Sequence, residues 1–413
     1  DECGGVGSRI AGVIMTEEAE TVEDVQVGLS GGTISNMSTE ADGAYEFNNL
    51  ENGYDYTVTP QLDNNYLNGV STFDLVLISK HILGVTPLNS PYKMIAADVN
   101  NSQSISTVDI IKIRKLILNV DTEFEGNTSW RFVDAAYVFP DPSNPWAEAF
   151  PEVFNVNNLD ANIDDADFVA VKIGDVNGSV TANNFADVDN RNMEGVFAFN
   201  VADVAVKAGN EYTVTFTAAD IAKIQGYQFT LTFDNEALEL VDLISGVVTE
   251  ENFGMRFVSE GMITTSWNGE AKSDDVLFSL VFSARADAQL SELIGVSSRY
   301  TVAEAYNQND GTMDVAINFG NTSVATAGFE VYQNTPNPFK GETQIGFNLP
   351  QSAEVTVTIN DVTGKVLKLV RGDFAKGYNN VTVHSNDLPA TGVLYYTVST
   401  DEFTATKKMI IVE

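Results

Sequence analysis

The sequence is poor in cysteine and histidine. Cys3 is the only cysteine in 413 residues, and His81 and His384 are the only histidines. A single cysteine excludes internal disulfides and cysteine-based zinc sites. Two histidines leave little room for a histidine-rich metal site or a Ser-His-Asp triad. An extracellular protein without disulfides needs another source of rigidity, and bound calcium is a common one.

Positive charge is scarce as well. The chain has 22 Lys and Arg residues against 58 Asp and Glu residues, which gives a net charge of −36. Because such a surface repels nucleic acid and anionic membranes, we expect neither as a partner. The acidity suits divalent cations, or it serves solubility alone. No apolar run approaches the roughly 20 residues of a membrane span, so no span is expected.

Apolar residues make up 44% of the chain, which is enough for hydrophobic cores. From Arg9 to about Asp63, short segments alternate apolar and polar residues and are separated by Asp-Gly and Asn-Gly turns. ADGAYEFNNL followed by YDYTVTP resembles the carboxypeptidase-regulatory-like or Cna-B-like β-sandwich. We therefore expect a first β-sandwich at residues 1–62.

A segment of fifteen residues then occurs twice. VSTFDLVLISKHILG starts at Val70, and ISTVDIIKIRKLILN starts at Ile105. Each copy predicts a helix with apolar residues at i, i+3 and i+7, so that the two stripes face each other in a small core. These stripes are Leu75, Ile78 and Ile82 in the first copy, and Ile110, Ile113 and Ile117 in the second.

Oxygen-bearing side chains precede the second copy at the spacing of a calcium loop. With Asp98 at position 1, the ligands are Asn100, Ser102, the carbonyl of Ser104, Ser106 and, at position 12, Asp109. Because only the two aspartates are charged, we expect a weak site, on the order of 10⁻⁴–10⁻³ M. The alternative is an Asx-rich turn that caps the helix without a metal.

The first copy has a degraded loop. Asp63, Asn65 and Asp74 fall at positions 1, 3 and 12, but Leu67 stands at position 5 and cannot bind a cation. Either this half binds no ion, or oxygens arrive from elsewhere. Asp175 and Asn177 form an isolated D-x-N pair that could complete the site, or they form an ordinary Asp-Asn-Gly turn.

Two loop-helix units of this kind resemble a type I dockerin, which we expect at residues 63–182 with a loop-rich extension. In dockerins, loop positions 10 and 11 contact the cohesin. The resemblance therefore implies partner contacts at Thr72, Phe73, Thr107 and Val108. The broken first loop, the long spacer between the repeats and the large extension depart from the dockerin pattern.

Two further modules follow a polar linker. YQFTLTFDNEALELVDLISG lies in a strand-rich segment, residues 195–319, that resembles a cohesin-like β-sandwich. Residues 329–413 contain VYQNTPNPFKGETQIGFNLP, INDVTGKVL, LPATGVLYYTV and KKMIIVE. In this order they resemble the C-terminal sorting domain of type IX secretion cargo. That resemblance implies the type IX secretion machinery as a partner, and a secreted or cell-surface location.

Together these patterns predict a mainly β, multidomain protein with three small β-sandwich modules and one small α-helical calcium-loop (dockerin-like) module. We expect a non-catalytic, calcium-stabilised extracellular protein for surface scaffolding or adhesion, and not an enzyme, because no motif places an acid beside a nucleophile. The first alternative is a subunit that self-associates head to tail into filaments. The second is the non-catalytic C-terminal part of a larger secreted enzyme.

Overall fold

The computed structural model describes residues 7–183, 193–273, 275–320, 324–326, 329–389 and 391–412. Strands dominate it, so the predicted mainly β, multidomain class is confirmed. The chain divides into two compact units. The first holds residues 1–116 and 121–186, and the second holds residues 117–120 and 187–413. No helix in the described ranges is long and apolar enough to cross a membrane.

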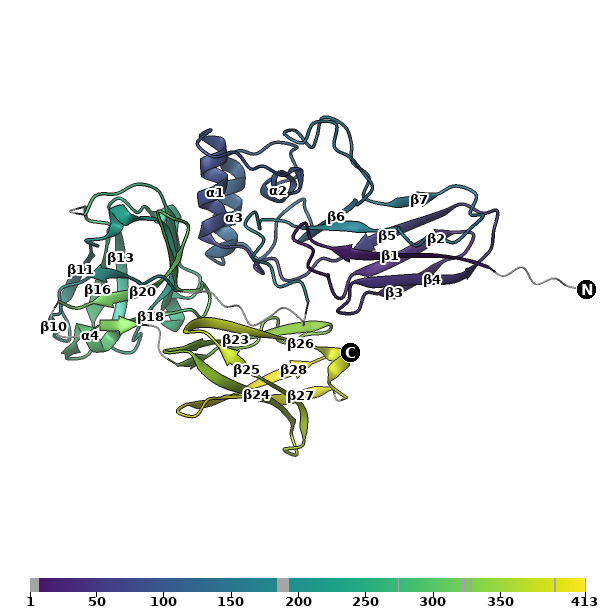
Figure 1. Cartoon of the computed structure of the whole chain (residues 1–413). Helices are drawn as coiled ribbons and strands as arrows, with labels where there is room; N and C mark the ends of the chain where they lie inside the picture. The colour runs from purple at the N-terminus through teal and green to yellow at the C-terminus, as the bar shows by residue number, and fades with distance from the viewer. Residues whose placement is uncertain are drawn as a thin grey trace, which may run out of the picture. The chain divides into compact units, whose positions relative to one another are not determined.

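The first unit contains a sandwich of two four-stranded sheets, with strand orders β4-β1-β8-β6 and β3-β2-β5-β7 (Figure 1). The first sheet consists of β1 (Ser8–Met15), β4 (Ala44–Leu50), β6 (Trp130–Asp134) and β8 (Phe168–Lys172). The second consists of β2 (Gln26–Gly31), β3 (Ser35–Ser38), β5 (Tyr56–Gln61) and β7 (Phe154–Val156).

The boundary expected at residue 62 is therefore wrong. The chain leaves the sandwich after β5 and later returns to it with β6, β7 and β8. The physical reason is burial, since Trp130, Phe132 and Phe168 share one hydrophobic core with Ile10 and Tyr45. Without the returning strands, the first 62 residues would expose a large part of that core.

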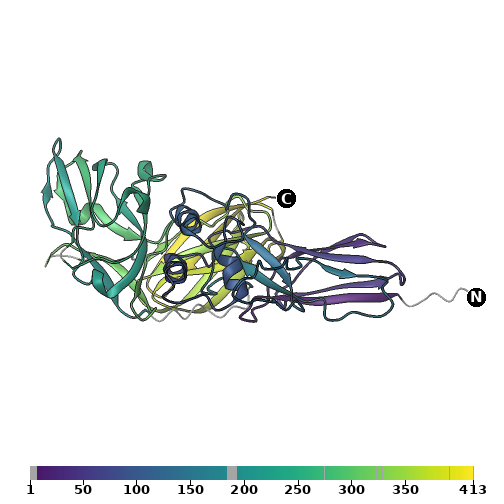
Figure 2. The ribbon, with the colours of Figure 1, turned by 90° about the horizontal axis from the view of Figure 1, so that it is seen from above.

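Between strands β5 and β6 the chain forms three helices: α1 (Thr72–Ile82), α2 (Pro91–Ala97) and α3 (Thr107–Ile117). Helices α1 and α3 run side by side in Figure 1, and Figure 2 shows the blue helices nearly end-on. The predicted stripes are largely confirmed, because Leu75, Ile78, Ile113 and Ile117 are buried. Ile82 is exposed instead, since it is the last residue of α1.

The start of each of the first two helices is fixed by a serine. Ser71 caps α1 through a capping box with Asp74. Ser90 caps α2 by accepting hydrogen bonds from two backbone N–H groups, and Pro91 follows at the first helical position, where its missing N–H costs nothing.

The second unit begins with a two-sheet sandwich built around phenylalanine. One sheet has the order β11-β16-β13, and the other has β14-β15-β12-β19-β20-β21, with β18 pairing to β12 and β9 to β20. Phe216 and Phe278 stack with their centroids 4.4 Å apart in its core. Its strands include β9 (Val196–Asn200), β11 (Glu211–Phe216), β12 (Ile224–Phe233), β13 (Leu238–Ser245), β14 (Phe253–Gly254), β15 (Met262–Asn268), β16 (Phe278–Ala284), β18 (Ile294–Ser297), β19 (Glu304–Asn307), β20 (Thr312–Asn318) and β21 (Val324–Thr326).

The C-terminal sandwich also has two sheets, with orders β22-β23-β26 and β25-β24-β27-β28. As the alternation predicts, Val355, Val357 and Ile359 point into its core. The strands are β22 (Glu330–Val331), β23 (Glu342–Leu349), β24 (Ala353–Asp361), β25 (Val366–Phe374), β26 (Gly377–His384), β27 (Gly392–Ser399) and β28 (Thr404–Ile411).

The return of β6, β7 and β8 gives a prediction about fragments. A fragment of residues 7–62 should stay unfolded, whereas a fragment of residues 7–183 should unfold cooperatively, because only the longer one contains both complete sheets. Circular dichroism during urea titration distinguishes them. A cooperative transition in the shorter fragment would contradict the shared core.

Candidate functional site

The loop before α3 holds its carboxylates by backbone hydrogen bonds. Asp98 accepts from the N–H groups of Ser102 at 2.8 Å and Gln103 at 2.7 Å. Asp109 accepts from the N–H of Ser106 at 2.9 Å, so its carboxylate faces back across the loop. Both aspartates are buried. The predicted ends of the loop, positions 1 and 12, are therefore brought together.

The middle of this loop closes on itself. The side-chain oxygen of Asn100 accepts from the Ser102 N–H at 3.0 Å, and the Ser102 hydroxyl donates to the Ser104 carbonyl at 3.3 Å. The Ser106 hydroxyl lies 3.0 Å from Asp109. All six ligands predicted from the sequence thus border one short loop, and all offer oxygen atoms.

The loop before α1 is not where the repeat predicts it. Asp63 accepts from the Ser129 N–H at 2.8 Å and so bonds to the start of the β6 region, away from Asp74. Tyr66, three residues later, also bonds to this region, because its hydroxyl donates to the Asn127 carbonyl. The tentative ligand Asp63 is therefore wrong, because its carboxylate bonds to Ser129, whereas Asn65 stays a prediction.

Residues 175–180 take the place of the first half of that loop. Asp74 accepts from the N–H groups of Val176 at 2.8 Å and Asn177 at 3.2 Å. Asp175 accepts from the N–H groups of Ser179 at 3.2 Å and Val180 at 2.8 Å. The structure thus brings Asp175 and Asn177, which follow strand β8, next to Asp74 in the first turn of α1. This is the arrangement expected if the D-x-N pair completes the first loop.

The split loop repeats the continuous one position by position. In both, the residue at position 1 accepts from the N–H groups at positions 5 and 6, as Asp98 and Asp175 do. In both, the serine at position 5 donates to the carbonyl at position 7. Ser102 bonds to Ser104 in the continuous loop, and Ser179 bonds to Gly69 at 3.0 Å in the split one. The chain is interrupted only between positions 6 and 7.

Sequence reasoning missed Ser179, Ser71 and the carbonyl of Gly69, which stand at positions 5, 9 and 7 of the split loop. A signal was available, because DVNGS at residues 175–179 matches DVNNS at residues 98–102 in all but one position. The order of the segments hid it, since a calcium loop is expected to be continuous.

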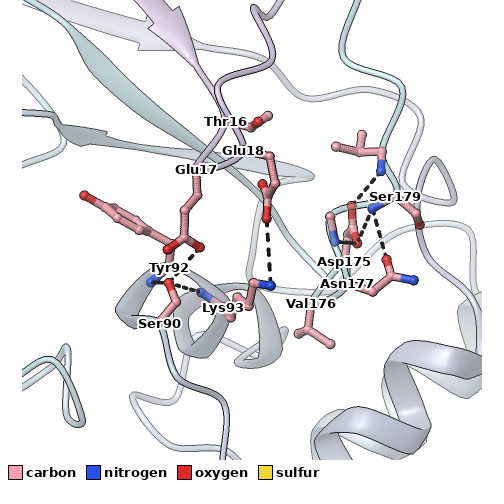
Figure 3. Close-up of polar contacts among 12 residues, drawn as sticks. Thr16, Glu17, Glu18, Ser90, Tyr92, Lys93, Asp175, Val176, Asn177 and Ser179 are labelled. Atoms are coloured by element: carbon pink, nitrogen blue, oxygen red, sulfur yellow. Dashed lines mark hydrogen bonds and ion pairs between the residues drawn. The ribbon is translucent and has the colours of Figure 1, made fainter. Parts of the chain in front are cut away.

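The split loop lies beside a small cavity. Figure 3 shows Asp175, Asn177 and Ser179 next to Glu18 and Lys93, whose charged atoms are 3.8 Å apart. Gly178 has a φ of +71°, and a Cβ there would approach the Glu18 carboxylate to 2.7 Å. The cavity measures about 30 Å³, which is room for about one water molecule. It is too small for an organic substrate.

The carboxylates of the split loop are costly to bury. Burial raises the pKa of Asp74 well above its ordinary value, and the nearby Asp175 carboxylate raises it further. Burial also raises the pKa of Asp175 to about 6, although backbone N–H donors and Lys172 oppose this. Lys172 is itself buried, which lowers the pKa of its ammonium group to about 7. The loop therefore has more negative charge than its surroundings neutralise.

Calcium fits this donor set. A hard divalent cation takes six to eight oxygens from carboxylates, amides, hydroxyls and carbonyls, and both loops offer these types alone. Two buried carboxylates that disfavour each other are what a bound cation would stabilise. The residues that would hold it are Asp98, Asn100, Ser102, Ser104, Ser106 and Asp109 in one loop, and Asp175, Asn177, Ser179, Gly69, Ser71 and Asp74 in the other.

The predicted partner positions differ in accessibility. Thr72 is completely buried, so it cannot contact a partner and that expectation is wrong. It is the first residue of α1, directly after the capping serine. Phe73 is half-buried, whereas Thr107 and Val108 are exposed at the start of α3. The two copies of the repeat therefore do not offer equivalent surfaces.

Two family models match parts of the chain. Residues 197–319 match the cohesin domain, and residues 331–412 match the secretion system C-terminal sorting domain. These matches confirm the predicted cohesin-like module and the type IX sorting domain. The sorting domain shows that the chain is a secreted or cell-surface protein. The dockerin-like and Cna-B-like resemblances stay predictions.

Several solved cohesin structures are similar to part of the chain. One is from a type I cohesin–dockerin complex of Clostridium thermocellum and is 16% identical. The match spans 30% of this chain and 94% of the matched chain, with a TM-score of 0.24. A type I cohesin from Pseudobacteroides cellulosolvens is 18% identical and covers 32% and 93%, with a TM-score of 0.22. A type II cohesin dyad from Acetivibrio cellulolyticus is 9% identical and covers 50% and 88%, with a TM-score of 0.24. No curated protein matches the chain.

The raised pKa of Asp175 predicts how stability depends on pH without calcium. Between about pH 4 and pH 6, the folded state keeps a proton that the unfolded state has released, so the free energy of unfolding should fall as pH rises. Calcium requires the ionised form and should reverse this slope. Urea titrations at several pH values, with chelator or with calcium, measure both slopes.

Asp175→Asn provides the matched control for this measurement, since it removes the titrating group but keeps the size of the side chain. Its calcium-free stability should lose the fall between pH 4 and pH 6 that Asp175 causes. Identical pH profiles for wild type and Asp175→Asn in chelator would contradict the assignment.

Proposed function

We propose that this chain is a non-catalytic, calcium-stabilised, modular protein that serves in scaffolding or adhesion at the cell surface. The observation that carries the proposal is the equivalence of the two loops, one continuous and one assembled from residues 69–74 and 175–180. Two matching sets of oxygen ligands in a chain with no possible internal disulfide support calcium as its internal crosslink.

Export supports the same proposal. The sorting domain directs the chain out of the cell, where calcium is available at the millimolar concentrations that weak extracellular sites require. Cohesin domains are protein-interaction modules, so the match at residues 197–319 supports a protein partner. A protein-binding module on a secreted or cell-surface chain is what scaffolding or adhesion requires.

A groove on the first sandwich contains an acidic residue that does not suit glycoside hydrolysis. This groove, of about 340 Å³, lies on the first sandwich and is lined by Arg9, Tyr45, Glu46 and Asp164. Arg9 bonds to Asp164 at 2.6 Å and to Glu46 at 3.1 Å. The hydrogen bond from Arg9 lowers the pKa of Asp164. The acid in glycoside hydrolysis is a carboxyl group whose pKa is raised, so Asp164 does not suit that role.

Self-assembly of copies is the second candidate function. It is favoured by the cohesin match at residues 197–319, because a protein-interaction module in a chain that also carries a dockerin-like repeat could bind another copy head to tail.

Calcium removal should destabilise the first unit. At a calcium concentration of about 100 times Kd, each site adds roughly 2.7 kcal/mol to the free energy of unfolding, and a chelator removes this amount. Asp98→Ala and Asp175→Ala should each lower the melting temperature in calcium and make it less sensitive to chelator. Differential scanning calorimetry measures both effects.

Asp287→Ala is the matched control, because Asp287 is an exposed aspartate in the second unit that pairs with Lys207. It should leave the chelator effect at the wild-type size. If chelation changes neither the wild-type melting temperature nor that of the two loop variants, the calcium proposal is wrong.

A further inference from the structure

Strand β8 ends on a buried lysine, Lys172, which is 4% exposed. Its ammonium donates to the Tyr66 carbonyl at 2.9 Å and to the Ile173 carbonyl at 3.5 Å. Among the residues that the structure describes, these neutral oxygens are its only hydrogen-bond partners, and none of them is a carboxylate. A cation buried without a direct ion pair is costly, so its position calls for a physical reason.

Two buried carboxylates lie near this ammonium. Asp175 follows Lys172 by three residues, and both line the small cavity beside the split loop. Asp74 is held at the same place by the hydrogen bond from the Val176 N–H at 2.8 Å. Burial lowers the pKa of Lys172, and the charges of Asp175 and Asp74 oppose that shift. The ammonium is therefore close enough to both carboxylates to stabilise them.

Residues 63–66 lie against the same lysine. The repeat predicts this segment at the start of the first loop, but Asp63 bonds to the Ser129 N–H instead, and the Tyr66 carbonyl accepts from Lys172. Asp63 is exposed, so water screens its charge. Strand β8 thus leads into the residues that replace this segment and also carries the side chain that holds the segment in its new position.

The continuous loop has an apolar residue where the split loop has this lysine. IAADVNNS at residues 95–102 aligns with KIGDVNGS at residues 172–179, so Ile95 is the counterpart of Lys172. Ile95 is completely buried. The same buried position is therefore apolar before one loop and cationic before the other, which points to a role for the lysine at the split loop.

The charges at the split loop indicate that role. Without calcium, one ammonium against two buried carboxylates leaves one negative charge, whereas with calcium the same groups would carry one positive charge in excess. Glu18 and Lys93 beside this loop pair with each other and add no net charge (Figure 3). Lys172 therefore stabilises the closed loop in the absence of calcium and opposes the binding of the ion.

We propose that Lys172 is an internal counter-cation of the split loop, which lets the loop close before calcium is available and keeps its calcium affinity low. This inference rests on the proposed calcium function and adds a second cation to it. The sorting domain directs the chain out of the cell, so the loop meets millimolar calcium only after export. A loop that first closes on Lys172 and later takes up calcium suits this order.

Calcium titration calorimetry of the full chain tests this role at pH 6, below the pKa of about 7 of Lys172. Asp98→Ala removes the continuous loop, so the split loop is measured alone. Adding Lys172→Gln keeps a hydrogen-bond donor but removes the charge, and should strengthen calcium binding roughly tenfold or more. Adding Lys172→Arg keeps the charge and should leave the affinity close to that of Asp98→Ala. Unchanged or weaker binding with Lys172→Gln would overturn the proposal.

Urea unfolding of the same variants gives a second readout. In chelator, Lys172→Gln should lower the unfolding midpoint of the first unit, and in saturating calcium this loss should shrink, because the ion supplies the missing positive charge. If the variant is unfolded in chelator, calcium should refold it. Equal losses in chelator and in calcium, or a variant that calcium does not refold, would mean that Lys172 is needed for packing alone.

Asp175→Asn provides the matched background, because only the continuous loop then binds calcium. Lys172→Gln should not change the affinity of this loop, whose equivalent position holds Ile95. A tenfold change here would contradict a local role at the split loop.

The Asp98→Ala titration separates this inference from the proposed function. If Asp98→Ala binds no calcium, the proposed calcium site at the split loop is wrong, and the inference with it. If it binds calcium with an affinity that Lys172→Gln does not strengthen, only the counter-cation is wrong.

Discussion

The burial of Asp74 and Asp175 at one point constrains the first unit more than any other contact. Asp74 opens helix α1, and Asp175 follows strand β8, so the hydrogen bond from Val176 to Asp74 joins residues 102 apart in sequence. Backbone N–H groups satisfy the oxygens but do not cancel the charges. Lys172 adds one positive charge, and its own burial lowers its pKa to about 7. A divalent cation would supply the remaining neutralisation.

This constraint explains why the sandwich and the helices form one unit. Segment 175–180 continues from β8, so it cannot pair with α1 unless β8 is in place between β1 and β6. Covalent closure of a loop of about 100 residues is worth about 4–5 kcal/mol in the chain-entropy model. A calcium ion that binds both segments would likewise close this loop and stabilise the folded unit. Such a crosslink suits a rigid joint in a chain of several modules.

The sequence predicted the local features and missed the long-range ones. The repeat identified both helices, and the oxygen spacing identified the continuous loop from Asp98 to Asp109. The alternation in Val355, Val357 and Ile359 placed one face of a C-terminal strand. The boundary at residue 62 and the ligand Asp63 were wrong because both predictions assumed that neighbours in sequence stay neighbours in space. Local periodicity carries no information about which later segment returns, as 130–134 and 175–180 do.

The number of bound calcium ions tests the central claim most directly. Native mass spectrometry of the full chain, titrated with calcium, should show two specific ions, and Asp175→Asn should retain one. One ion in the wild-type protein, unaffected by Asp175→Asn, would mean that the split loop is only a hydrogen-bonded turn. The absence of any specific ion would contradict calcium at both loops.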